Sequence, residues 1–222
     1  MGAEMPKQFL ELDGVPIVIF TLRRLMACAA ISDFFIATRG EEVASLEARV
    51  AAEKFGRPVR VVRGGESRQE SVGNALALVA PETEIILVHD AVRPFVTREM
   101  VERLIAEARS RGAAIVGIPA IDTVKEVKRA NMPEDVARIT ATIPRERIVL
   151  AQTPQAFSAA VLREAFERAK QDEFTASDEA ALVERIGHDV YVVAGSERNL
   201  KITRPADMDL ARFYLEQERQ RR

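Results

Sequence analysis

Ile85-Ile86-Leu87-Val88-His89-Asp90-Ala91-Val92-Arg93-Pro94 lies near the middle of the chain and joins a short apolar run to charged residues. Residues 85–89 are rich in β-branched side chains, which is typical of a strand covered on both faces. In an open parallel sheet, ligands bind just beyond the carboxyl ends of the strands. Asp90 and Arg93 stand there, where an acid can hold a metal and a guanidinium can hold a phosphate. On these ten residues alone, a turn-capping Asp90 and a surface ion pair at Arg93 explain the pattern equally well.

Strand and helix patterns alternate on both sides of this segment. The sequence predicts strands at residues 34–38, 59–62, 85–89, 114–118, 148–152 and 190–193. It predicts helices at residues 16–30, 43–55, 69–79, 97–111, 159–170, 177–186 and from 205 onward. Thr97 is a suitable N-cap for its helix. Such alternation predicts an α/β fold with a doubly wound, mostly parallel sheet.

The alternation breaks at Asp122. Residues 123–128 and 137–142 alternate polar and apolar side chains, which predicts a β-hairpin that leaves the main sheet. No internal repeat or Pro/Gly-rich linker divides the chain. We therefore expect a single domain over residues 1–222, with a β-arm inserted at residues 122–146.

Composition excludes several classes of protein. Of 222 residues, 47% are hydrophobic, which is enough for a sizeable core, and the net charge of -2 argues against a nucleic-acid-binding surface. Cys28, the one cysteine, cannot form an internal disulfide and is expected to be a small core residue. No apolar run reaches the length of a membrane span, and residues 1–8 lack the apolar segment of a signal peptide. The expected location is the cytoplasm, without a nucleic-acid or membrane partner.

Basic residues occupy several loops at predicted strand ends: Lys7, Arg68, Arg93, Arg145 and Lys201. Gly64-Gly65 would allow a ligand to approach the backbone closely. Arg68 and Ser71 then stand at the start of a helix, where amide donors favour anions. Taken alone, an ordinary glycine turn with a surface arginine is the simpler explanation.

Other local motifs are weak or missing. Thr153-Pro154-Gln155 is predicted to follow a strand, and residues 199–205 form an unremarkable loop before the last helix. His89 and His188 lack the local spacing of a metal pair. No Gly-x-Ser-x-Gly, Cys-x-x-Cys or P-loop sequence occurs, so hydrolase, redox and P-loop functions lack support.

Together, seven short blocks resemble the 2-C-methyl-D-erythritol 4-phosphate cytidylyltransferase family. They are Pro6-Lys7-Gln8-Phe9-Leu10, Gly64-Gly65-Glu66-Ser67-Arg68-Gln69-Glu70-Ser71-Val72, His89-Asp90-Ala91-Val92-Arg93-Pro94, Asp122-Thr123, Thr153-Pro154-Gln155, Ser177-Asp178-Glu179 and Asn199-Leu200-Lys201-Ile202-Thr203-Arg204-Pro205. The blocks stand in family order and cover nearly the whole chain. Each is weak alone, but the set is highly specific.

The resemblance implies a reaction and an architecture. Methylerythritol phosphate would attack the α-phosphate of CTP, releasing pyrophosphate, in the non-mevalonate route to isoprenoids. The implied fold is Rossmann-like, with a β-arm that exchanges across a homodimer. A close alternative is ribitol 5-phosphate cytidylyltransferase, which shares most of these blocks.

The resemblance also implies roles for individual residues. Lys7, Lys201 and Asp90 are expected to act in catalysis, with Lys7 on the triphosphate and Asp90 as the ligand of Mg²⁺. Asn199 is a weaker candidate for the second shell of the metal. The expected nucleotide-binding residues are Gly65, Glu66, Arg68, Ser71, Asp90 and Ala91. The expected sugar-phosphate residues are Arg93, Thr123, Arg145, Thr153, Ser177 and Lys201, with Thr123 and Arg145 contributed by the partner subunit.

The chain departs from the family in two places. Position 177 is serine where the family often has threonine, which keeps a hydroxyl. Family members also begin with a buried strand and a glycine-rich loop ending in Arg-Met-Gly, whereas this sequence begins at Met1-Gly2. We expect a misplaced start or an omitted segment, whose upstream codons encode that strand and loop. A dimeric nucleotide-binding protein without catalysis is the alternative that this departure favours.

Overall fold

The computed structural model describes residues 6–129, 133 and 135–221. Its strands are β1 (Glu11–Leu12), β2 (Val15–Pro16), β3 (Phe34–Thr38), β4 (Val59–Arg63), β5 (Ile85–Val88), β6 (Ala113–Pro119), β7 (Val124–Lys128), β8 (Arg138–Ile143), β9 (Val149–Ser158) and β10 (Tyr191–Ala194). Its α-helices are α1 (Ile17–Met26), α2 (Val43–Glu53), α3 (Arg68–Leu76), α4 (Arg98–Arg111), α5 (Ala159–Gln171), α6 (Glu179–Arg185) and α7 (Pro205–Gln220), and short 3-10 turns lie at Lys7–Phe9, Gly40–Glu42 and Arg145–Arg147. None of the helices in these ranges is long and apolar enough to cross a bilayer.

Four strands form the central sheet in the order β10-β6-β9-β5. β10 runs parallel to β6, whereas β9 is antiparallel to both β5 and β6. β3 and β4 form a separate parallel pair. The predicted α/β class is confirmed, and the sheet is mixed because β9 reverses the local direction.

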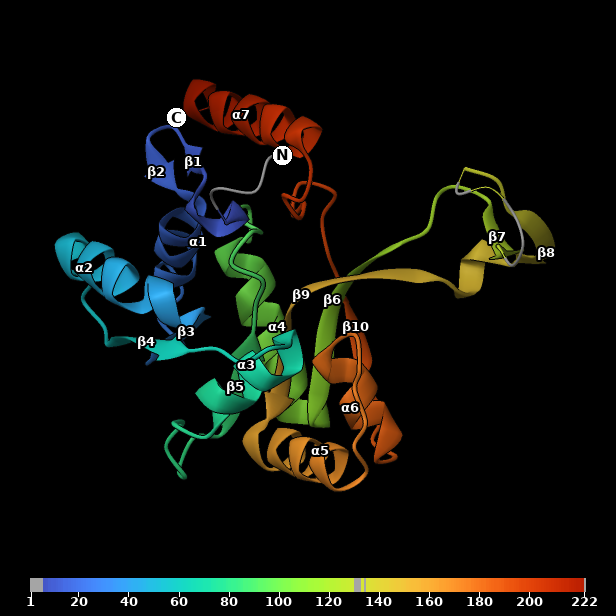
Figure 1. Cartoon of the computed structure of the whole chain (residues 1–222), viewed down its shortest axis with the longest axis horizontal. Helices are drawn as coiled ribbons and strands as arrows, with labels where there is room; N and C mark the ends of the chain where they lie inside the picture. The colour runs from blue at the N-terminus through green and yellow to red at the C-terminus, as the bar shows by residue number, and fades with distance from the viewer. Residues whose placement is uncertain (1–5, 130–132, 134, 222) are drawn as a thin grey trace.

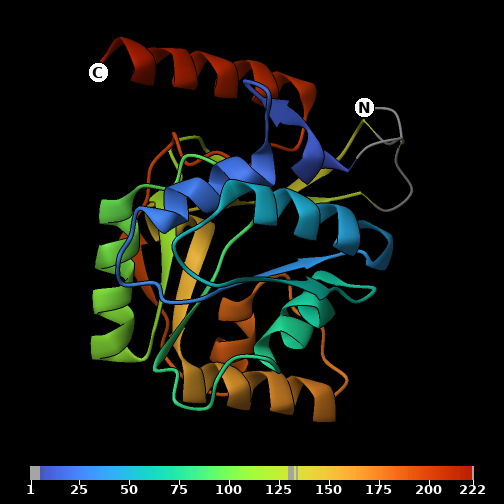
Figure 2. The ribbon, with the colours of Figure 1, turned by 90° about the vertical axis from the view of Figure 1, so that its left-hand side faces the viewer.

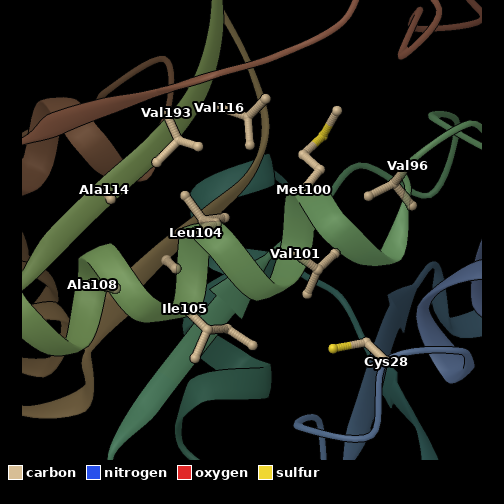
Figure 3. Close-up of a cluster of buried hydrophobic side chains, with 11 residues drawn as sticks. Cys28, Val96, Met100, Val101, Leu104, Ile105, Ala108, Ala114, Val116 and Val193 are labelled. Carbon is tan, nitrogen blue, oxygen red and sulfur yellow. The ribbon is translucent and has the colours of Figure 1, made fainter.

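Helices cover both faces of the central sheet (Figures 1 and 2). On one face, α4 packs its apolar stripe against β6, β9 and β10, and buried Cys28 joins this cluster as expected (Figure 3). On the other face, α5 and α6 pack around Phe157, which is completely buried. The predicted cap of α4 is also confirmed, because the Thr97 hydroxyl accepts a hydrogen bond from the Met100 amide at 3.2 Å.

The N-terminal and C-terminal segments form a further layer. Asp13 and Gly14 both have positive φ and join β1 to β2 in a tight hairpin turn. This hairpin and α1 pack under α7, which lies at the top of Figure 1, in a cluster centred on Leu12, Ile17 and Met208. The C-terminal helix thus covers the start of the described chain.

A cavity of about 740 Å³ separates β3 from β5. Strand residues such as Ile36 and Ile86 line two of its sides, and helical residues such as Leu22 and Leu76 line the others. Within the described chain, β3 pairs only with β4, and β5 pairs only with β9. Each therefore presents an open strand edge to this cavity, and Asp90 is among the residues that line it. We call this cavity the β3–β5 slot.

β7 and β8 pair as an antiparallel hairpin that projects away from the sheet (Figure 1). Long connections from β6 and into β9 carry it outward. Its strands agree with the predicted hairpin to within a residue at each end. We refer to residues 122–146 as the arm.

Candidate active site

Asp90 is the centre of a cluster of charged side chains at the end of β5. Its Oδ2 lies 3.0 Å from Lys201 Nζ and 3.4 Å from Arg93 Nε, and its Oδ1 lies 3.5 Å from Arg68 Nε. The Asp90 side chain is 12% exposed, so these charges meet in a partly desolvated pocket. Three of the residues that the sequence placed in separate loops therefore converge on this carboxylate.

This arrangement keeps Asp90 ionised. Burial opposes ionisation, but attraction to Lys201, then to Arg68 and Arg93, outweighs it and holds the pKa of the Asp90 carboxyl below its usual value. One carboxylate faces three cations, so the pocket carries a net positive charge. Such a pocket suits a polyanionic ligand, in particular phosphate groups.

The glycine loop before α3 is held in a tight conformation next to this cluster. Gly65 donates its backbone N–H to Ser71 Oγ at 3.1 Å, and Ser71 Oγ donates in turn to the Ser67 carbonyl at 2.9 Å. A Cβ on Gly64 would lie 2.7 Å from Ser71 Oγ, and one on Gly65 would lie 2.4 Å from the Cβ of Glu70. Only glycine therefore fits at both positions. Glu66 is exposed in the same loop and donates its amide to the carboxylate of Glu70.

Thr153 lies inside β9, so the expectation that residues 153–155 follow a strand is wrong. The Asp90 amide donates to Thr153 Oγ1 at 3.0 Å, which joins β9 to the acidic centre. Buried Gln155 donates to Asp178 at 2.7 Å and accepts from the Ala180 amide at 3.1 Å. These polar side chains can occupy a buried strand because their hydrogen bonds are made within the protein.

Asn199 supports the loop that carries Lys201. Its side chain is fully buried and donates to the Thr153 carbonyl at 2.9 Å and to Gln152 at 3.2 Å, while its backbone carbonyl accepts from Arg93 at 2.8 Å. These contacts fix the loop beside Asp90. They give Asn199 a structural task that the sequence did not suggest.

The remaining predicted residues lie at the margin of the cluster or far from it. Ala91 accepts a hydrogen bond from the Thr21 hydroxyl at 2.7 Å beside Asp90. Ser177 is exposed just before α6, and Lys7 is exposed in the first 3-10 turn, without an ion pair to another described residue.

Thr123 directly precedes β7, and Arg145 begins the 3-10 turn that follows β8. Both residues therefore lie on the arm, which projects away from the central sheet and its strand β5 (Figure 1). Arg145 donates to the Ile121 carbonyl at 2.6 Å, and its side chain is 55% exposed. A single chain therefore does not bring these two residues to the cluster.

The donor set permits one metal at Asp90. Across residues 6–129, 133 and 135–221, no group of three acidic, histidine or cysteine side chains is arranged to hold a metal. Mg²⁺ is commonly bound by one or two carboxylates together with substrate phosphates. Asp90 alone therefore fits a metal that arrives with a phosphate ligand, and it does not fit a preformed protein cage.

Sequence reasoning missed Glu179, which completes the cluster. Glu179 is the first residue of α6, its side chain is 1% exposed, and its Oε1 lies 2.7 Å from Arg68 Nη1. Glu179 belongs to the block Ser177-Asp178-Glu179, but an acid just after Asp178 looks like an ordinary helix start, so the sequence assigned it no role of its own. Only the fold brings it against a residue 111 positions away.

Comparison with known proteins identifies the family of this chain. A family model described as IspD, 2-C-methyl-D-erythritol 4-phosphate cytidylyltransferase, matches residues 1–217. The chain belongs to this family. The cytidylyltransferase of Acidobacterium capsulatum is 52% identical over 217 residues, which cover 97% of this chain and 90% of that protein. The cytidylyltransferase of Solibacter usitatus is 47% identical over 212 residues, covering 96% and 86% respectively.

Solved structures of the cytidylyltransferase family agree with the fold. The crystal structure of 2-C-methyl-D-erythritol 4-phosphate cytidylyltransferase from Thermus thermophilus is 34% identical, with a TM-score of 0.77 over 94% of this chain and 93% of that one. The 4-diphosphocytidyl-2C-methyl-D-erythritol synthase of Anaerococcus prevotii gives a TM-score of 0.83 at 28% identity, over 94% and 93% of the two chains. The family resemblance carried by the seven sequence blocks is thus confirmed.

Proposed function

We propose that this chain transfers the cytidylyl group of CTP to 2-C-methyl-D-erythritol 4-phosphate at the Asp90 cluster. The family membership supports the reaction, and the convergence of Lys201, Arg93 and Arg68 on Asp90 carries the assignment of the site. A phosphate oxygen of the acceptor forms a bond to the α-phosphorus of CTP. The bond from that phosphorus to the bridging oxygen breaks, and pyrophosphate leaves.

The protein's task in this reaction is positioning and charge neutralisation. Lys201 and Arg93 offer cationic donors to phosphate oxygens, and the glycine loop at residues 64–67 offers backbone that a nucleotide can approach closely. Lys7 approaches the triphosphate from the first 3-10 turn. Mg²⁺, held by Asp90 and phosphate oxygens, would neutralise the charge that grows on the leaving pyrophosphate.

The acceptor distinguishes the leading function from its alternatives. Purified protein should release pyrophosphate from CTP only when methylerythritol phosphate and Mg²⁺ are both present. Ribitol 5-phosphate, tested at equal concentration, should give a much smaller kcat/KM. The reverse preference would favour the ribitol enzyme, and CTP binding without turnover would favour a non-catalytic binding protein.

The working unit in this proposal is a homodimer formed through the arm. Three large apolar side chains of the arm are exposed, Val127, Val136 and Ile139, and Ile121 is exposed directly before it. An isolated two-stranded hairpin is at best marginally stable, and an exposed apolar patch commonly marks an interface. A partner copy would cover this patch and would bring Thr123 and Arg145 to the second active site.

Sedimentation equilibrium can test the dimer. Val127→Lys on the arm should shift the population to monomer, whereas Val192→Lys on β10, similarly exposed and of the same type, should leave it dimeric. Unchanged dimers in the Val127 variant would contradict the role of the arm.

The single buried cysteine and the lack of a membrane-spanning helix in the described chain are compatible with the cytoplasm, where we place the enzyme.

A further inference from the structure

Glu179 is a buried acid with one charged partner. Its Oε1 accepts from Arg68, while its Oε2 is buried without a hydrogen-bond partner in the described chain. Burial raises the pKa of the Glu179 carboxyl, and the hydrogen bond from Arg68 opposes that rise. Buried ion pairs of this kind often add little net stability compared with packed apolar side chains. Stability alone therefore does not account for a buried carboxylate at this position.

The position of Glu179 is fixed by β9. Gln155 of that strand binds the Asp178 side chain and the Ala180 amide, and Asp178 caps α6 by accepting from the Ala181 amide at 3.1 Å. The first turn of α6 is therefore attached to the buried strand on both sides of Glu179. A carboxylate held this firmly can orient a flexible partner.

That partner is shared with the active site. Arg68 gives Nη1 to Glu179 at 2.7 Å and directs Nε toward Asp90 at 3.5 Å. A guanidinium is planar and offers its donors in a fixed fork, so fixing one nitrogen sets the direction of the others. The shorter contact is the one to Glu179, which leaves Asp90 only a long contact with the same cation.

We propose that Glu179 is a positioning residue that holds the Arg68 guanidinium back from Asp90. Without it, Arg68 can turn and bind the Asp90 carboxylate through two nitrogens, which occupies the oxygens needed by the nucleotide and its metal. This inference rests on the proposed function of the Asp90 cluster. It assigns to α6 a task in CTP binding, although Glu179 itself need not touch the substrate.

A double-mutant cycle on the whole protein tests this role. Glu179→Gln should raise the dissociation constant of Mg²⁺–CTP and the KM for CTP by roughly tenfold to a hundredfold, the usual effect of losing a hydrogen bond to a charged group, with a smaller effect on kcat. Glu184→Gln, an exposed change in the same helix, should alter neither value. On an Arg68→Gln background, Glu179→Gln should cost almost nothing further, since the guanidinium that it restrains is gone.

A merely structural Glu179 would give a different pattern. Its loss would weaken CTP binding equally on both backgrounds, in parallel with a lower melting temperature, and that result overturns the proposal. Unchanged CTP binding in Glu179→Gln overturns the positioning role as well. If the wild-type protein still turns over CTP in that case, the proposed function stands and only the role of Glu179 fails. If wild-type protein does not bind CTP, the proposed function fails. In that case the positioning of Arg68 is tested without CTP, by the side-chain Nε–H signal of Arg68 in an NMR spectrum. An identical signal in wild-type protein and in Glu179→Gln refutes the proposal.

Discussion

An extended apolar segment placed in the β3–β5 slot should stabilise the protein and join the β3–β4 pair to the central sheet. An extended segment suits the slot because unpaired edges of β3 and β5 border it and residues of α1 and α3 also line it. Unpaired strand edges and apolar side chains that line an open cavity are unfavourable in water. We expect the segment to pair with β3 on one side and with β5 on the other.

The magnitude follows from the length of β5, which has four residues. Burying four apolar side chains contributes about 6–12 kcal/mol, and ordering four residues costs about 6 kcal/mol. Burial and ordering therefore offset each other to within a few kcal/mol. About four new backbone hydrogen bonds then add ~2–6 kcal/mol. For a domain of this size, each kcal/mol raises the melting temperature by about 2–4 °C.

Thermal unfolding of extended proteins provides the assay. The extension to be tested is the one that the family resemblance implies, an apolar strand followed by a glycine-rich loop ending in arginine, attached before Met1. That extension should raise the melting temperature by at least several degrees and protect edge amides of β3 and β5 from hydrogen exchange. A matched extension with serine at the strand positions should do neither. Equal melting temperatures and equal CTP turnover with and without the extension would refute the reasoning.

Three further predictions concern single residues. Asp90→Asn should lower kcat at saturating CTP on the order of a hundredfold, while the exposed Asp189→Asn should not; full activity of the Asp90 variant across a Mg²⁺ titration contradicts its role. Arg145→Ala mixed with Lys7→Ala should regenerate active sites if each site takes one group from each chain, and mixed dimers no more active than their parents would exclude this. Burial lowers the pKa of His89 to about 4, whereas the same histidine in the unfolded chain has a pKa of about 6.5. As the pH falls through this range, the unfolded chain takes up the proton first, and the free energy of unfolding should drop by about 2–3 kcal/mol. Urea unfolding at pH 7 and pH 4 measures this, and a wild-type loss no larger than that of His89→Asn would refute it.

The sequence predicted the elements whose apolar pattern matches their burial. β5 follows from a run of β-branched residues, α4 from a helical apolar stripe with a Thr97 cap, and the arm hairpin from the alternation of polar and apolar residues. β9 was predicted at residues 148–152, but it continues to Ser158. Thr153, Pro154 and Gln155 resemble a loop because their polar groups and proline are unusual in a buried strand. Only the tertiary hydrogen bonds to Asp90, Asp178 and Ala180 make that continuation possible.

The candidate site shows the same division between local and long-range information. Asp90, Arg93, Arg68 and Lys201 were recognisable because each stands beside a strand end, where an α/β fold gathers ligand contacts. Glu179 was not, since its role depends on a contact that no local pattern encodes. The distinction has a physical basis: cations at strand ends indicate that an anion can bind, whereas their orientation depends on buried partners from other elements. In this protein one such partner stands on α6, and its distance to Arg68 is shorter than any of the ion-pair distances to Asp90. A charge pattern in the sequence can thus predict which class of ligand the site attracts. The contacts that keep the Asp90 carboxylate accessible to that ligand form only once β9 and α6 have packed together.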